Sequence, residues 1–193
     1  MRRRVRVVWL VLVTLIALVA ALEYREVMAS RAARGARLDP RMLLPVPATQ
    51  IGAVEIADAG VLHRFERDAA GAWFYHGAHA ASEGRHAHAP DPATAARIGQ
   101  VVDAFGRTRI ERQLPPGADP RTYGLTTPRT VVLVYRGKER QPLAQYAVGD
   151  VAPDTVSRYV DMVGGGGIVT IPGYQIDNLL GLVAAVSVVP ARR

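Results

Sequence analysis

The sequence predicts an α+β protein in which an N-terminal transmembrane helix is followed by antiparallel β-meanders and two packed helices. Three observations predict this class. An arginine-flanked apolar run opens the chain, two stretches contain short alternating segments separated by glycine-containing turns, and each stretch ends in a segment with helical spacing. Because both stretches follow the same plan of a meander and then a helix, they also indicate a pseudo-repeat.

The first element is an apolar run from Val7 to Leu22 that follows four arginines, and counting from Val5 gives 18 residues. A helix over this run would be about 27 Å long, which is enough to cross a bilayer core. The preceding arginines favour a cytoplasmic N-terminus, so we expect a single-pass protein of the bacterial inner membrane with a periplasmic C-terminal domain. We assign residues 1–37 to this anchor helix and its polar extension.

A cleaved signal peptide is the alternative, with Val19-Ala20-Ala21 as the cleavage site. We favour an uncleaved anchor, because the apolar run is longer than a usual signal core and continues into a helix-forming segment without a break. Pro40, Pro45 and Pro47 then forbid a continued helix, which predicts a Pro-rich linker over residues 38–50. The α+β domain is expected over residues 51–193.

The first half of the domain is predicted to be a three-stranded meander and a helix. Alternation predicts strands over residues 51–58, 61–68 and 72–75. Asp91-Pro92 has the form of a helix N-cap followed by proline at the first helical position. The helix over residues 93–106 should pack on the sheet through apolar side chains at helical spacing: Ile98, Val101, Val102 and Phe105.

The second half repeats this plan. A short strand is expected near residues 108–112, and a loop rich in turn residues follows it. Strands are predicted over residues 130–136, 142–149, 157–163 and 167–172, with the four glycines from Gly164 to Gly167 forming a hairpin connection. A terminal helix from about Tyr174 presents Ile176, Leu179, Leu180 and Val183.

Charge and composition exclude two function classes. The net charge is +7, but residues 1–41 hold nine arginines against three acids and account for +6 of it. The remainder is nearly neutral and shows no arginine cluster interleaved with aromatics, so we expect no nucleic-acid partner. The chain has no cysteine, which excludes disulfides and thiolate chemistry.

The order of several short motifs resembles the domain-of-unknown-function 4340 family over residues 51 to 180. The most specific piece is Tyr123-Gly124-Leu125 with Pro128, followed by a strand pair and the Gly149-Asp150 turn. The other pieces are I-x-x-V-x-I from Ile51, HRFER from His63, GAW from Gly71, VVDAF before the helix end, VVLV from Val131, SRYV from Ser157 and IVTIP from Ile168.

This resemblance implies a membrane-anchored extracytoplasmic protein that is associated with ABC-type export or gliding-motility transport. No catalytic residue can be carried over from the family. The chain has one copy of the unit where longer members have more, which suggests a small partner subunit.

Four of the five histidines fall between Trp73 and Pro92, and they raise the question of a metal site. His76 and His79 are spaced H-x-x-H, and His86 and His88 are spaced H-x-H, a set that suits copper, zinc or nickel with Glu83 as a further ligand. However, the segment is rich in alanine and glycine, and nothing in it fixes the rings. We favour a loop without a functional metal, and keep an extracytoplasmic metal-binding protein as an alternative.

The sequence contains no recognisable catalytic set. Ser82, Ser157 and Ser187 lie outside any G-x-S-x-G motif, and the aspartates at turns are explained by turn formation. We therefore expect a non-enzymatic protein without a cofactor.

The function predicted is an accessory subunit of a larger membrane assembly, most simply an ABC-type transporter, with a small structural subunit of another membrane complex as the alternative. Ala17, Ala20 and Ala21 form a small-residue surface that would allow the anchor to pack on integral membrane partners. Tyr123 and Leu125 most simply fill the layer between the two halves. They are also candidates for a partner-binding loop, since loops often carry function.

Overall fold

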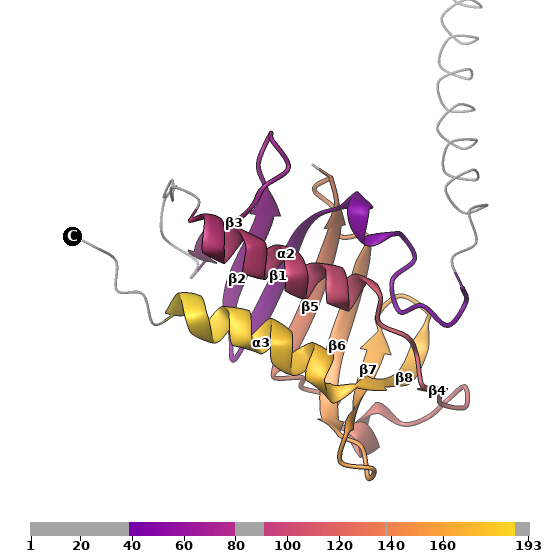
Figure 1. Ribbon diagram of the computed structural model, residues 1–193. Helices are drawn as coiled ribbons and strands as arrows, with labels where there is room; N and C mark the ends of the chain where they lie inside the picture. The colour runs from indigo at the N-terminus through magenta and orange to yellow at the C-terminus, as the bar shows by residue number, and fades with distance from the viewer. Residues whose placement is uncertain (1–38, 80–90, 138, 188–193) are drawn as a thin grey trace, which may run out of the picture. The chain divides into compact units, whose positions relative to one another are not determined.

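The computed structural model describes residues 39–79, 91–137 and 139–187. It confirms the α+β class: an eight-stranded antiparallel sheet is packed against two helices (Figure 1). The predicted N-terminal helix over residues 1–37 lies outside the described residues, and so does the part of the predicted metal-binding segment His76–His88 that follows His79.

The first meander consists of β1 (Ile51–Asp58), β2 (Val61–Arg67) and β3 (Trp73–His79), as predicted. Ala59 and Gly60 both adopt positive φ in the two-residue turn that joins β1 to β2. Along β2 the side chains alternate as expected, with His63 and Phe65 buried on one face and Arg64 on the other.

Helix α2 (Pro92–Gly106) begins where its sequence signal indicated. The Asp91 carboxylate accepts a 2.9 Å hydrogen bond from the Thr94 amide, and Pro92 occupies the first turn, where its missing N–H has no consequence. Ile98, Val102 and Phe105 are buried, so the predicted face of the helix is the one that packs on the sheet.

The second half supplies the remaining elements. They are β4 (Arg112–Gln113), η2 (Pro120–Tyr123), β5 (Thr130–Arg136), β6 (Ala144–Val151), β7 (Ser157–Met162), β8 (Gly167–Pro172) and α3 (Gly173–Ser187). A short 3-10 helix, η1 (Ala48–Gln50), precedes the first meander. The four predicted strands and the terminal helix are confirmed, whereas the strand expected near residues 108–112 is only two residues long and begins at Arg112.

The strand order is β3-β2-β1-β5-β6-β7-β8-β4, so the two meanders meet where β1 pairs antiparallel with β5. The first three strands and the strands β5, β6 and β7 extend outward from this central pair. The pseudo-repeat that the sequence indicates stays a prediction. Helices α2 and α3 lie on the same face of the sheet (Figure 1).

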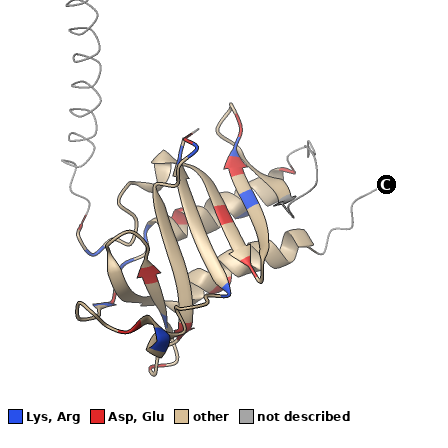
Figure 2. Cartoon of the chain, turned by 180° about the vertical axis from the view of Figure 1, so that it is seen from behind, with Lys and Arg blue, Asp and Glu red and all other residues tan. Residues whose placement is uncertain are grey.

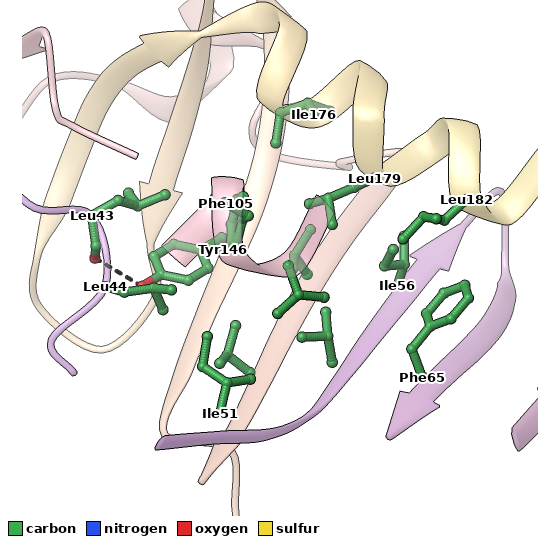
Figure 3. Close-up of a cluster of buried hydrophobic side chains, with 14 of the residues drawn as sticks. Leu43, Leu44, Ile51, Ile56, Phe65, Phe105, Tyr146, Ile176, Leu179 and Leu182 are labelled. Carbon is green, nitrogen blue, oxygen red and sulfur yellow. Dashed lines mark hydrogen bonds between the residues drawn. The ribbon is translucent and has the colours of Figure 1, made fainter. Parts of the chain in front are cut away.

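The main core lies between this face and the two helices, as Figure 3 shows. Ile56 and Phe65 from the first meander lie near Leu182 of α3, and Ile176 and Leu179 of the same helix belong to the same core. Because aliphatic side chains from both meanders and both helices contribute, the two halves share one core.

The predicted linker over residues 38–50 is corrected in its second part. Residues from Arg41 onward belong to the compact unit, and Leu43, Leu44 and Val46 are buried in it. The prolines do exclude helix over Leu43 to Val46, but the apolar residues between them pack on the domain. The Tyr146 hydroxyl donates a buried 2.9 Å hydrogen bond to the Leu43 carbonyl, across 103 positions of sequence (Figure 3).

Candidate functional site

The second face of the sheet is covered unequally. Over β6 to β8 it is covered by residues 114–127, where Leu125 is buried against Ala147 and Ile168. Over β1, β2, β3 and β5 no helix of the described residues lies on it, and charged residues are found on these strands (Figure 2). We call this uncovered region the open face and define it by Glu55, Arg64, Glu66, His76 and Tyr135 with the apolar residues between them.

These five residues form a hydrogen-bonded network across four strands. Arg64 donates from Nη1 to Glu55 and from Nε to Glu66, both at 2.7 Å. The Tyr135 hydroxyl donates to the second Glu55 oxygen at 2.5 Å, and Nδ1 of His76 lies 2.9 Å from the second Glu66 oxygen. The Arg64 guanidinium also lies 5.2 Å from the centre of the Tyr135 ring. Each side chain is thus held by at least one neighbour.

The electrostatics of the network follow from partial burial beside opposite charges. Burial raises the pKa of Tyr135 to about 12, and the bond to Glu55 adds to this effect, so the hydroxyl remains a donor. Burial also acts to raise the pKa of Glu66, but the hydrogen bonds and charges of Arg64 and His76 outweigh it and hold that pKa below its usual value. The guanidinium therefore lies between two carboxylates that it helps to order.

The structure places the predicted metal ligands as follows. His76 belongs to the open face, and His79 ends β3. His86 and His88 lie outside the described residues. Within the parts of the chain that are described, no group of three or more histidine, cysteine, aspartate or glutamate side chains is arranged to hold a metal ion. A metal site in the His76–His88 segment therefore stays a prediction.

His63 is a buried histidine that the sequence did not indicate as a candidate site residue. His63 is 6% exposed on the helix-covered face, its Nδ1 lies 3.0 Å from the Tyr75 hydroxyl, and the two rings stack. Burial lowers the pKa of His63, and the charge of Asp58 offsets part of this effect. The alternation of His63 and Phe65 along β2 could have identified His63 as buried, because it places both side chains on the same face of the strand.

We predict that this buried histidine makes stability depend on pH. Because the pKa of His63 is lower in the folded than in the unfolded chain, the unfolded state binds the proton first as the pH falls below about 6.5. The free energy of unfolding should therefore decrease between about pH 6.5 and 5, and less so in His63→Gln, which keeps a polar side chain but does not titrate there. Urea unfolding at several pH values measures this. Equal slopes for the two proteins would contradict the prediction.

Tyr123, Gly124 and Leu125 lie in the loop that covers β6 to β8. The Tyr123 ring centre is 4.6 Å from that of Tyr159, and Leu125 is 7% exposed. A β-carbon at Gly124, which has φ +71°, would lie 2.5 Å from the Asp150 carboxyl carbon, and one at Gly149 would overlap the Tyr123 carbonyl. The Tyr-Gly-Leu and Gly-Asp motifs thus contact each other. The side chains of Tyr123 and Leu125 pack inside the domain, and partner binding by them stays a prediction.

A cleft of about 440 Å³ lies beside this contact, at the ends of β1, β5 and β6. Gly124, Gly149 and Asp150 form part of its wall, and Ile176 and Leu180 of α3 contribute apolar side chains. Arg158 also lines it and donates from Nη1 to the Gly149 carbonyl at 3.4 Å. The cleft is therefore apolar on the α3 side and charged at its rim.

Comparisons with models of protein families, with curated proteins and with solved structures find no match to this chain. The resemblance to the domain-of-unknown-function 4340 family therefore rests on the sequence motifs. Among the described residues, no helix is both long and apolar enough to cross a membrane. The predicted anchor, with Ala17, Ala20 and Ala21, lies outside the described residues.

Proposed function

We propose that this protein is a non-enzymatic accessory subunit, anchored in the bacterial inner membrane by its N-terminal helix, that binds an integral membrane partner through the open face of its periplasmic domain. The observation that carries the proposal is the unequal covering of the sheet. The chain's own loop covers the β6–β8 part of this face, while no helix of the described residues covers the β1, β2, β3 and β5 part, where Arg64, Glu66 and His76 are partly exposed.

The composition of the open face suits a protein partner. Leu62, Phe74 and Leu133 are partly exposed there, on the same side of the strands as the charged network. Specific interfaces combine apolar contacts with hydrogen-bonding polar groups, and arginine and tyrosine are enriched in them. Since Arg64 and Tyr135 are already held by Glu55, less conformational entropy would be lost when a partner binds.

The kind of assembly is proposed from the sequence. The motif resemblance indicates ABC-type export or gliding-motility transport, and the arginine-flanked apolar run predicts that the domain is tethered close to the bilayer. An accessory subunit needs a tether and a binding face, and it needs no catalytic group. A small structural subunit of another membrane complex would use the same two features.

Purification of the full-length protein in mild detergent, followed by identification of the co-purifying chains, tests the proposal. We expect transporter permease and ATPase subunits, and we expect their recovery to be lost in Leu133→Asp. Val163→Asp, which changes an exposed valine outside the open face, is the matched control and should retain them. Recovery of another defined membrane complex would favour the alternative. A solitary chain, or equal recovery with both variants, would refute binding through the open face.

A further inference from the structure

One row of side chains crosses the second face of the sheet, from the open face to β7. Leu62 lies opposite Ala57, Ala57 opposite Val131, Val131 opposite Ala147, and Ala147 opposite Asp161. Directly paired residues of neighbouring antiparallel strands project to the same side of the sheet, so all five share this face. Leu62, Ala57 and Val131 are partly exposed, which makes the row apolar within the open face. Asp161 therefore lies at the border of the open face, on the second strand beyond Val131.

Asp161 is a carboxylate without compensation in its surroundings. It is partly exposed, and its side chain forms neither a hydrogen bond nor an ion pair with the part of the chain that the structure describes. Its charge is therefore stabilised by hydration. A partner that covered this border would remove that hydration, and the loss is costly for a carboxylate unless a positive charge or hydrogen-bond donors replace the water.

The charged network of the open face adds to this excess of negative charge. Glu55 and Glu66 share one guanidinium, that of Arg64, whose nitrogens lie 2.7 Å from an oxygen of each. Arg129, which precedes β5, is already paired with Asp58 at 3.3 Å, so it does not offset these carboxylates. Counted with neutral histidine, the open face and its border therefore carry more negative than positive charge.

We propose that the partner segment bound by the open face is both apolar and basic. Its apolar side chains cover Leu62, Val131 and Leu133, and a lysine or arginine of the segment pairs with Asp161. An acidic or uncharged segment would bury this carboxylate without compensation, whereas a basic segment offsets the lost hydration and is attracted by the surrounding negative charge. The inference rests on the proposed function, since it names the chemistry of the partner at the same face.

Charge changes beside Leu133 test this inference in the mild-detergent purification of the full-length protein. Gln145 of β6 is partly exposed and lies opposite Leu133. Gln145→Lys should lower the amount of partner recovered per chain on the order of 10-fold, whereas Gln145→Glu, of nearly equal length, should keep or raise it. Gln100→Lys makes the same charge change at an exposed position of α2, on the other side of the sheet, and is the matched control. Thermal unfolding of each variant shows that the fold is retained.

The salt dependence of recovery supplies a second measurement. Recovery with the wild type should fall as the salt concentration rises, and it should fall less steeply with Asp161→Asn, because salt screens the attraction that this carboxylate provides. Equal recovery with Gln145→Lys and Gln145→Glu, or with Gln145→Lys and Gln100→Lys, would overturn this inference and leave the proposed function intact if Leu133→Asp still loses the partner. Recovery that Leu133→Asp leaves unchanged would overturn both.

Discussion

Replacement of Phe105 by alanine is expected to lower the free energy of unfolding by about 3 to 4 kcal/mol. Phe105 is 1% exposed, and its ring meets that of Tyr146 edge to face, with 6.0 Å between the ring centres. The substitution removes the transfer free energy of the ring and leaves a cavity at the point where α2, β6 and the segment around Leu44 meet (Figure 3). Chemical denaturation monitored by circular dichroism measures the change.

Gln100→Ala is the matched control for this prediction. Gln100 is exposed on the same helix, so its replacement should change stability by less than about 0.5 kcal/mol. A loss of under 1 kcal/mol for Phe105→Ala would show that the end of α2 is not part of the shared core. The comparison separates core packing from the intrinsic helix propensity of alanine, since both variants introduce the same residue into α2.

Gly149→Ala is expected to destabilise the domain by about 3 kcal/mol, although it adds one methyl group. The new β-carbon would overlap the Tyr123 carbonyl oxygen and lie 3.0 Å from the Leu125 side chain. Backbone atoms form the closest contact, so a rotamer change cannot relieve it, and the loop over residues 114–127 must move away from β6. Thermal unfolding and protease sensitivity of this loop should both report the change.

Gly181→Ala is expected not to destabilise the domain. Among the described residues, apart from its chain neighbours and the backbone of its own helix, the added β-carbon would come within 4 Å only of the Arg97 guanidinium, at 3.9 Å. Alanine is favoured over glycine inside a helix by roughly 0.5 to 1 kcal/mol. This variant should be neutral or more stable than the wild type. Equal effects of Gly149→Ala and Gly181→Ala would mean that the loop does not press on β6 as the structure shows.

The elements of this fold could be predicted because each has a signal within a few neighbouring residues. Alternation of apolar and polar side chains identified β1, β2 and β5 to β8, and Asp91-Pro92 marked the start of α2. Helical spacing identified Ile98, Val102 and Phe105 as the buried face. These signals are local because hydrogen-bond geometry and side-chain direction within an element depend on adjacent residues.

The start of the domain could not be found in this way. Three prolines correctly excluded a helix, but the burial of Leu43 and Leu44 depends on α2 and β6, which begin only at Pro92 and Ala144. No pattern in the residues next to Leu43 or next to Tyr146 predicts the hydrogen bond between them. From composition alone a proline-rich segment is predicted to be a linker, because the surface that it packs on is formed by distant parts of the chain.

The candidate site was determined by the tertiary structure for the same reason. The sequence by itself determined the strands, the helix faces and the histidine-rich segment that includes His76. Only the pairing of β1 with β2 and β5 brought Glu55 to Arg64 and Tyr135, and only the tertiary packing of residues 114–127 placed them over β6 to β8. Strand order and loop packing depend on which apolar surfaces, distant in the sequence, can be buried against each other. They therefore cannot be predicted from any short stretch of residues.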